Sequence, residues 1–405
     1  MQAVNDPLKL GFCPKRLQRI TDWMHRYIDA GKLAGATTIV TRKGQLAYAN
    51  SIGKKDIDTN QNWDFETILR FYSMTKPITS VAMMQLYEKG LFHLDDPVEQ
   101  YLPELKNMNV LLPEATSLND CIPSKNKVTI HDLFLHTAGF TYGFNNDLLS
   151  DAYIERKTDF DPTHGTNREV LKRVADLPLQ FEPGTKWNYG INTDILGILV
   201  EVISGKTLDR YFEENIFQPL GMTDTAFDIS PAKQDRLASL YVPTSENGLQ
   251  LYENAINTEY LEGNVKCLSG GGGLLSTASD YLKFADMMRQ QGKLQEGRIL
   301  GPRTIDQMTT NHLPGDLASM GQPVFSEVSF KGVGFGLGVW SMLNPNLAGL
   351  SGSIGDYGWG GAASTVFWVD PKEDMIVMFL TQLLPSSHYP LRKELRALTY
   401  QSLID

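Results

Sequence analysis

The chain has 405 residues, of which 42% are hydrophobic and 21% are charged, so it is long enough to bury a large core. Its formal net charge of −10 excludes the broad basic surface that nucleic acids and anionic membranes require, so we expect a small-molecule partner. No apolar signal segment opens the chain and no later run can span a bilayer, which predicts a cytoplasmic protein. Its 3 cysteines are too scattered for a disulfide framework or a metal site, and we expect neither a metal nor a cofactor.

Amphipathic helices are predicted at both ends of the chain. Apolar residues recur at helical spacing from Leu17 to Ile28 and stop at Gly31, and a similar pattern runs from Leu391 to Leu398. Strand-like runs lie just inside these helices, at residues 37–41, 46–49, 364–369 and 375–381. We therefore predict an α+β fold in which an antiparallel sheet is flanked by the N- and C-terminal helices.

The middle of the chain has a different pattern, because helical runs and long polar loops replace the strand signals. Helical spacing is found at residues 78–88, 129–136, 167–175, 194–204 and 208–217. Residues 107–127 and 145–166 look irregular, and loops of this length in a compact chain usually form lids or pocket walls. We predict two lobes: an α/β sandwich of residues 1–72 and 268–405, and a mostly helical lobe of residues 73–267.

A serine and a lysine lie at the start of the helix predicted over residues 78–88. Ser73 precedes Lys76 by three positions, which places both side chains on one helical face. A serine hydroxyl becomes a nucleophile when a base takes its proton and nearby N–H dipoles favour the developing negative charge. The same spacing occurs at Ser51/Lys54, Ser124/Lys127 and Ser230/Lys233. Only Ser73 opens an apolar periodic helix, although a helix-capping serine with a solvated lysine explains these residues equally well.

Other catalytic motifs are absent from the sequence or incomplete. No Gly-x-Ser-x-Gly pentapeptide occurs, which excludes the α/β-hydrolase type of Ser-His-Asp enzyme. His131 and His136 have no third ligand in view, and no His-Glu-x-x-His motif is present. The glycine-rich run 332–338 fits neither a dinucleotide-binding nor a phosphate-binding loop, so we interpret it as a strand near the pocket.

Short motifs spread over nearly the whole chain carry a family resemblance. They are Ser73-Met74-Thr75-Lys76-Pro77, Leu94-Asp95-Asp96-Pro97-Val98, Leu135-His136-Thr137-Ala138-Gly139-Phe140, Pro183-Gly184-Thr185-Lys186-Trp187-Asn188-Tyr189, Gly271-Gly272-Gly273-Leu274 and Trp359-Gly360-Gly361. With these motifs the sequence resembles the serine β-lactamase and penicillin-binding-protein superfamily, and within it most closely the family VIII carboxylesterases, which are related to class C β-lactamases. The resemblance implies a β-lactamase/transpeptidase-like fold, in agreement with the two predicted lobes.

The resemblance also implies roles for individual residues. Ser73 matches the family's nucleophile, Lys76 its partner lysine and Tyr189 the tyrosine of the second motif. The backbone N–H groups of Ser73 and Ala362 match the oxyanion hole. Free tyrosine and lysine side chains both lose a proton near about pH 10, so the sequence does not decide whether Tyr189 or Lys76 is the base.

Two motifs depart from the β-lactamase pattern. Ile191 stands where β-lactamases carry asparagine, with Asn192 one position late, and Trp359-Gly360-Gly361 replaces Lys-Thr-Gly. The resemblance therefore implies a substrate pocket formed by Trp359, Gly360, Gly361 and Ile191, in which an aromatic wall replaces the lysine that holds a substrate carboxylate. Because a buried carboxylate without a paired cation is costly, we expect esters to be preferred over β-lactams.

The function predicted from the sequence is a serine carboxylesterase that hydrolyses short-acyl esters through an acyl-enzyme on Ser73. One alternative is an acyltransferase that uses the same acyl-enzyme with an alcohol acceptor. Others are a β-lactamase, a D-Ala-D-Ala peptidase-type penicillin-binding protein and a non-catalytic relative. The sequence leaves open the natural substrate, the preferred acyl length, the choice between hydrolysis and transfer, and the oligomeric state.

Overall fold

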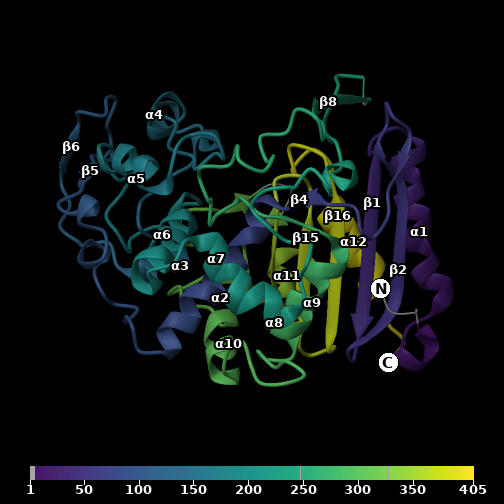
Figure 1. Cartoon of the computed structure of the whole chain (residues 1–405). Coiled ribbons are helices and arrows are strands. Elements are labelled where there is room, and N and C mark those ends of the chain that lie inside the picture. Colours follow the sequence, from purple (N-terminus) through teal and green to yellow (C-terminus); the bar gives the residue numbers. More distant parts are fainter. Residues whose placement is uncertain (1–4, 247, 326–327) are drawn as a thin grey trace.

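The computed structural model describes residues 5–246, 248–325 and 328–405 and contains an eight-stranded antiparallel sheet, whose strands β1, β2 and β16 lie to the right in Figure 1. The strand order is β12-β13-β14-β15-β16-β1-β2-β3. The bounds are β1 Gly35–Arg42, β2 Gln45–Asp56, β3 Gln61–Asn62, β12 Val333–Phe335, β13 Trp340–Met342, β14 Tyr357–Gly360, β15 Val366–Asp370 and β16 Met375–Thr381. Strand β1 pairs antiparallel with β2 and β16, so strands from both parts of the chain meet inside the sheet. The predicted antiparallel sheet is confirmed.

Helices α1 (Pro14–Asp29) and α12 (Leu391–Tyr400) cover one face of the sheet, as the sequence predicts. The buried stripe of α1 packs on the strands, and the ring of Trp23 lies 5.1 Å from that of Phe379 on β16. The Trp23 indole N–H also donates to a Glu394 carboxylate oxygen at 2.6 Å, which joins α1 to α12. Apolar burial and this hydrogen bond together fix both helices on the sheet.

Helix α9 (Ala278–Arg289) packs on strands β15 and β16 from the other face. Its residue Tyr281 lies 5.1 Å from Phe367 on β15 and 5.0 Å from Phe71, measured between ring centroids. Phe71 comes two residues before Ser73 in the sequence. The core under the sheet therefore extends directly to the segment that carries the candidate nucleophile.

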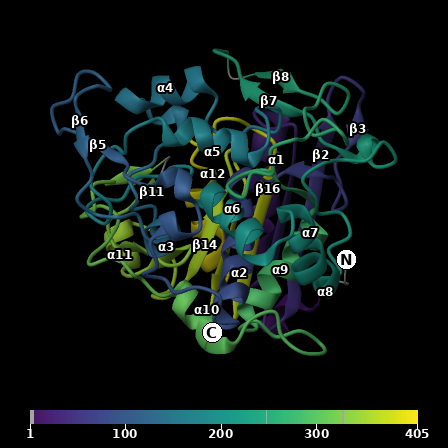
Figure 2. The same ribbon diagram turned by 60° about the vertical axis from the view of Figure 1, so that its left-hand side comes forward.

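Helix α2 (Thr75–Glu88) follows Ser73 and runs through the centre of the molecule, where it packs against α6 (Asn192–Ser204) (Figure 2). All its residues from 75 to 84 are buried, which suits a helix with apolar and small residues all round. Lys76 is the one charged residue of this buried stretch. A charge held there needs partners of its own.

The remaining elements connect these layers. The helices are α3 Ile130–Leu135, α4 Leu148–Arg156, α5 Asn167–Ala175, α7 Leu208–Phe212, a π-helical turn Glu213–Phe217, α8 Gln218–Leu220, α10 Pro302–Thr309, α11 Pro345–Ala348 and 3₁₀ turns at Pro7–Leu10, Tyr72–Met74, Val98–Gln100, Pro103–Leu105, Gly143–Asn145 and Gln234–Arg236. The short strands are β4 Leu69–Arg70, β5 Asn109–Leu111, β6 Cys121–Pro123, β7 Leu240–Pro243, β8 Leu249–Glu253, β9 Leu275–Ser276, β10 Val324–Phe325 and β11 Val328–Ser329. Among the residues described, no helix has both the length and the apolarity to cross a membrane.

Two segments predicted to be irregular contain regular structure. Residues 145–166 include α4, whose N-cap Asp147 accepts hydrogen bonds from the Leu149 and Ser150 N–H groups. Residues 107–127 include the β5–β6 hairpin. Both elements are short and stand among Asn, Asp and Pro residues, so their periodicity is too brief to be recognised in the sequence.

The lobe division at residues 72/73 and 267/268 stays a prediction. The hairpin β7–β8 belongs to the middle of the sequence, yet its Tyr241 exchanges backbone hydrogen bonds with the segment after β16: the Tyr241 N–H donates to Gln382 at 3.1 Å, and the Leu384 N–H donates to Tyr241 at 2.9 Å. We propose that residues 73–267, which include helices α2 to α8, form the second lobe, and that the hairpin β7–β8 of this lobe contacts the first lobe.

Candidate active site

Ser73 lies in the 3₁₀ turn Tyr72–Met74, which continues directly into α2. Tyr72 has a φ of +44°, a left-handed conformation that is strained for a non-glycine residue and recurs at functional sites. The hydroxyl of Tyr281 donates to the Met74 carbonyl at 2.8 Å and holds this turn on the core. The candidate nucleophile is therefore carried by a fixed turn rather than by a mobile loop.

Ser73 opens into a cavity of about 840 Å³. Aromatic side chains form much of its wall: Tyr72, Tyr142, Phe144, Phe160, Tyr189, Tyr252, Tyr260, Phe330, Trp340 and Trp359. The sequence-predicted residues that line it are Ser73, Tyr189, Trp359, Gly360, Gly361 and Ala362. One wall also carries Asp159, whose pKa is raised to about 6 by burial, against the hydrogen bond from the Gly143 N–H. A largely apolar cavity of this size suits a small organic molecule.

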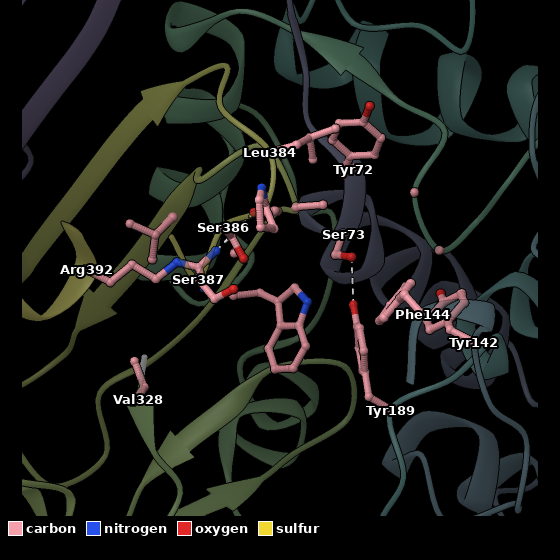
Figure 3. Close-up of a pocket in the computed structure, with 18 of the residues that line it drawn as sticks. Tyr72, Ser73, Tyr142, Phe144, Tyr189, Val328, Leu384, Ser386, Ser387 and Arg392 are labelled. Atoms are coloured by element: carbon pink, nitrogen blue, oxygen red, sulfur yellow. Dashed lines mark hydrogen bonds between the residues drawn. The ribbon is translucent and has the colours of Figure 1, made fainter. Parts of the chain in front are cut away.

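The structure brings Tyr189 and Lys76 to the Ser73 hydroxyl. Tyr189 Oη lies 2.7 Å from Ser73 Oγ, whereas Lys76 Nζ lies 3.4 Å from the same atom. Figure 3 shows the Tyr189 hydroxyl pointing at Ser73. The Tyr189 ring is held by Trp187, nearly parallel to it with centroids 6.1 Å apart, and by Trp359 at 5.6 Å. Tyr189 therefore makes the closer contact with Ser73 and has a fixed orientation.

Lys76 is 1% exposed and has three acceptors around its amino group. Nζ donates to Tyr142 Oη at 2.9 Å and to the Gly271 carbonyl at 2.7 Å, in addition to the longer contact with Ser73. It also lies 4.7 Å from the centroid of the Tyr189 ring. An ammonium group has three N–H donors and no lone pair, so these surroundings satisfy the charged form of Lys76.

A buried carboxylate, Asp194, balances this cation through Tyr142. Tyr142 Oη donates to Asp194 Oδ2 at 3.1 Å, while Asp194 Oδ1 accepts from Ser269 Oγ at 2.5 Å and from the Gly271 N–H at 2.9 Å. Burial raises the pKa of Asp194, and the Lys76 cation and these hydrogen bonds oppose that effect. Because each partner can donate to Asp194, we assign it the carboxylate form. Burial also holds the pKa of Tyr142 well above its usual value, so Tyr142 stays a neutral phenol.

The glycine run after Ser269 is required by this network. A Cβ atom on Gly271 would lie 2.3 Å from a carboxylate oxygen of Asp194, so a larger residue cannot occupy the position. The neighbouring Gly270 carbonyl accepts from Thr79 Oγ1 at 2.6 Å, which attaches the run to α2. The motif beginning at Gly271 thus serves to bring a backbone carbonyl to the Lys76 ammonium.

The residues that follow Tyr189 point away from the cavity, which corrects one prediction. Ile191 is the N-cap of α6, is 0% exposed within the hydrophobic core, and is not among the described residues that line the cavity. The prediction that Ile191 lines the substrate pocket is therefore wrong, because the start of α6 turns the Ile191 side chain into the core. Asn192 donates to His136 Nδ1 at 3.0 Å, so its amide does not replace the β-lactamase asparagine at the pocket.

The turn after β14 approaches the Ser73 turn closely. A Cβ atom on Gly361 would lie 2.3 Å from the Phe71 carbonyl oxygen, so glycine permits this approach. Arg392 donates to the Gly361 carbonyl at 3.0 Å and fixes the turn from the other side. Within the part of the chain that the structure describes, the Ala362 N–H has no backbone acceptor. The oxyanion hole of Ser73 and Ala362 stays a prediction, and this geometry is compatible with it.

Sequence reasoning missed Tyr142 and Asp194. Tyr142 lies just before a 3₁₀ turn in a segment without periodicity, and only the tertiary fold brings it to Lys76. One feature of the sequence pointed to Asp194: it opens the helix predicted over residues 194–204, and the residues after it are uncharged up to Val200. A charge on a buried helix needs a partner. Among the described residues, no group of three or more His, Cys, Asp or Glu side chains could hold a metal ion.

Comparisons with known proteins identify the family to which the chain belongs. The chain is 29% identical over 374 residues to the esterase EstB of Burkholderia gladioli, with 86% of each chain covered. It is 32% identical over 336 residues to the acyltransferase calJ of Penicillium decumbens, covering 79% of this chain and 77% of that protein. Among solved structures, EstCE1, a hydrolase with promiscuous acyltransferase activity, matches with a TM-score of 0.79 and 26% identity, over 97% of this chain and 99% of the other. The Beta-lactamase family model matches residues 20–401, and the chain therefore belongs to the Beta-lactamase family.

Proposed function

We propose that the protein is a serine esterase that forms an acyl-enzyme on Ser73, with Tyr189 as the base. The proposal is carried by the 2.7 Å contact between Tyr189 Oη and Ser73 Oγ. The three acceptors around Lys76 Nζ occupy the donors of an ammonium group, which has no lone pair for the serine proton. Tyr189 is then the nearer group that can take that proton.

In the acylation step Tyr189 acts as a phenolate, whose negative charge the Lys76 ammonium stabilises. The Ser73 O–H bond breaks as Oγ bonds to the ester carbonyl carbon; the proton moves to Tyr189 Oη, and the carbonyl π electrons move to the carbonyl oxygen. We assign the oxyanion to the N–H groups of Ser73 and Ala362, where each donor stabilises it by about 3 to 4 kcal/mol. Tyr189 returns the proton to the leaving alkoxide as the C–O bond breaks.

Release of the acyl group requires an acceptor, which is water in an esterase. Tyr189 takes a proton from the acceptor as the acceptor oxygen bonds to the acyl carbon. The bond between Ser73 Oγ and the acyl carbon then breaks, and the proton returns from Tyr189 to Ser73 Oγ. Acyl transfer to an alcohol is the second candidate function. It is favoured by the cavity of about 840 Å³, which has room for an alcohol beside an acyl group, and by the transferase activity in the names of calJ and EstCE1.

The substrates that we propose are small uncharged esters with short acyl groups. Such molecules match the aromatic lining of the cavity, which includes Trp359, the residue that the motif match sets in place of the β-lactamase lysine. The cavity wall also carries Arg392, Lys393 and Arg396. Arg396 pairs with Asp356 at 2.9 Å, and Arg392 donates to the backbone carbonyls of Gly361 and Thr365 at 3.0 and 3.2 Å. The net charge of −10 further disfavours polyanionic partners.

Ester hydrolysis and β-lactam hydrolysis can be compared on one enzyme preparation. We expect kcat/KM for p-nitrophenyl acetate and butyrate to exceed that for benzylpenicillin by a factor of about 10³ or more, because the penicillin carboxylate would be desolvated beside Trp359. A p-nitrophenyl series of rising acyl length, with and without added alcohols, measures acyl preference and the share of transfer. Penicillin turnover as fast as ester turnover would overturn the esterase proposal.

The Asp194 carboxylate offers a separate test of the charge balance. We expect Asp194→Asn to lower kcat by about tenfold or more and to destabilise the fold by about 3 to 5 kcal/mol, because it leaves the Lys76 ammonium buried without its counter-charge. Ester kinetics and thermal unfolding measure the two effects. Asp159→Asn is the matched control: it makes the same chemical change at a carboxylate in the cavity wall, where Asp159 accepts from the Gly143 N–H, and it should keep kcat within about twofold. Equal losses in both variants would refute the role of Asp194.

A further inference from the structure

We infer that His136 is a positioning residue that holds Tyr189 against Ser73. This inference rests on the proposed role of Tyr189 as the base. His136 belongs to a motif that carries the family resemblance, yet none of the catalytic steps above uses it. It is 0% exposed and ends α3 in the left-handed conformation, with a φ of +57°. A buried residue that keeps a costly backbone conformation beside a catalytic segment has a reason to be there.

The contacts of His136 fall on both sides of Tyr189 in the sequence. The His136 carbonyl accepts from the Asn188 N–H at 2.9 Å. Its Nδ1 atom faces the Gly190 N–H at 3.4 Å and Asn192 Nδ2 at 3.0 Å. One residue therefore binds the backbone immediately before and immediately after Tyr189, and also the start of α6. These three contacts therefore fix the backbone on both sides of Tyr189.

The imidazole ring fixes the orientation of the phenol as well. Its centroid lies 5.0 Å from that of the Tyr189 ring, 5.8 Å from that of Trp187 and 5.6 Å from that of Phe335 in an edge-on contact. Trp187 in turn stacks on Tyr189. His136 and Trp187 thus contact each other and the phenol ring, and together they restrict its movement away from Ser73.

The hydrogen bonds assign the tautomer of His136. A backbone N–H can only donate, so the contact with Gly190 requires an unprotonated Nδ1, and the proton lies on Nε2. Nε2 has no hydrogen-bond partner among the described residues, and its ring is surrounded by aromatic rings. Burial, followed by the Lys76 cation, holds the pKa of His136 well below its usual value. His136 is therefore a neutral acceptor that adds no second positive charge beside Lys76.

A matched pair of variants separates the acceptor from the ring. His136→Phe keeps an aromatic ring and loses the Nδ1 acceptor. His136→Asn loses the ring but places an amide oxygen near the Nδ1 position, and asparagine tolerates the left-handed conformation. Because a displacement of about 1 Å can cost about a hundredfold in rate, we expect His136→Phe to lower kcat by roughly tenfold to a hundredfold with KM changed by less than about threefold. His136→Asn should recover a large part of kcat.

A double-mutant cycle distinguishes positioning from general destabilisation. If His136 acts through Tyr189, then His136→Phe should change kcat by less than about twofold in the Tyr189→Phe background, where no base remains to be positioned. A loss caused by a weakened fold would persist in that background. Should His136→Phe fail to fold, Asn192→Leu replaces it in the same cycle, because it removes one donor to Nδ1 and leaves His136 unchanged.

The kcat values of these variants distinguish a failure of this inference from a failure of the proposed function. Normal kcat in Tyr189→Phe would reject Tyr189 as the base, and the inference with it. An impaired Tyr189→Phe enzyme in which the effects of the two substitutions multiply would reject only the positioning role of His136. An unchanged kcat in His136→Phe, or an equal loss in His136→Asn, would also reject it. The inference would be supported if His136→Phe changed kcat by less than about twofold in the Tyr189→Phe background and if His136→Asn recovered a large part of kcat.

Discussion

Ser73→Ala is expected to abolish ester hydrolysis while leaving the fold intact. Removal of a catalytic nucleophile typically costs a factor of about 10⁶ in kcat, and the remaining binding groups cannot replace it. The fold should tolerate the change, because Ser73 is not the N-cap of α2; that position belongs to Met74. The Ser73 hydroxyl contacts only Tyr189 and Lys76 among the hydrogen-bonding residues of the described chain. The measurements are p-nitrophenyl ester turnover and a thermal unfolding curve for both proteins.

The other Ser-x-x-Lys serines are the matched controls for this prediction. Ser51 bonds to Thr37 at 2.9 Å across β1 and β2, and Ser124 bonds to Glu182 at 2.9 Å on the surface, so neither hydroxyl resembles a nucleophile. Alanine at either position, or at Ser230, should leave kcat within about twofold. A fluorophosphonate should add one label, which peptide mapping should find on Ser73. Labelling of a different serine would overturn the assignment of the nucleophile.

The elements that could be predicted from the sequence are those set by local patterns. The periodic stripe of α1, the α6 helix and the pair β15 and β16 depend on residues near one another in the chain, and they were confirmed within a few residues. The approach of Ser73 and Lys76 depends on three positions of one helical turn. Strand β14 was not predicted, because Gly358 and Gly360 give it little strand character. Gly358 is needed there, since its Cβ would lie 2.2 Å from the Phe367 carbonyl oxygen.

The parts of the site that escaped prediction depend on contacts distant in sequence. Tyr142 and Asp194 reach Lys76 only because α2, α6 and the glycine run meet in the core. The assignment of Ile191 to the pocket was wrong for a related reason. A motif match gives the order of residues, but the start of α6 decides where each side chain points, and it turns Ile191 inward and Asn192 toward His136.

The second large effect is expected at the proposed base. Tyr189→Phe removes the oxygen that lies 2.7 Å from Ser73 Oγ and leaves the ring packing against Trp187 and His136 in place. General-base catalysis contributes factors of about 10² to 10⁴, so kcat should fall by an amount in that range, with KM and thermal stability little changed. Tyr252→Phe is the matched control, because Tyr252 also lines the cavity but is 65% exposed at its rim.

Lys76→Met should reduce kcat to a similar extent for a different reason. It removes the cation that stabilises the Tyr189 phenolate and leaves Asp194 buried without its counter-charge, so unlike Tyr189→Phe it should also cost about 3 to 5 kcal/mol of stability. Because both residues serve one proton transfer, the double variant should be about as slow as the slower single variant. Kinetics of the two single variants and the double variant, each with a thermal unfolding curve, provide the test. Near-normal kcat in Tyr189→Phe, with activity lost only in Lys76→Met, would return the role of base to Lys76.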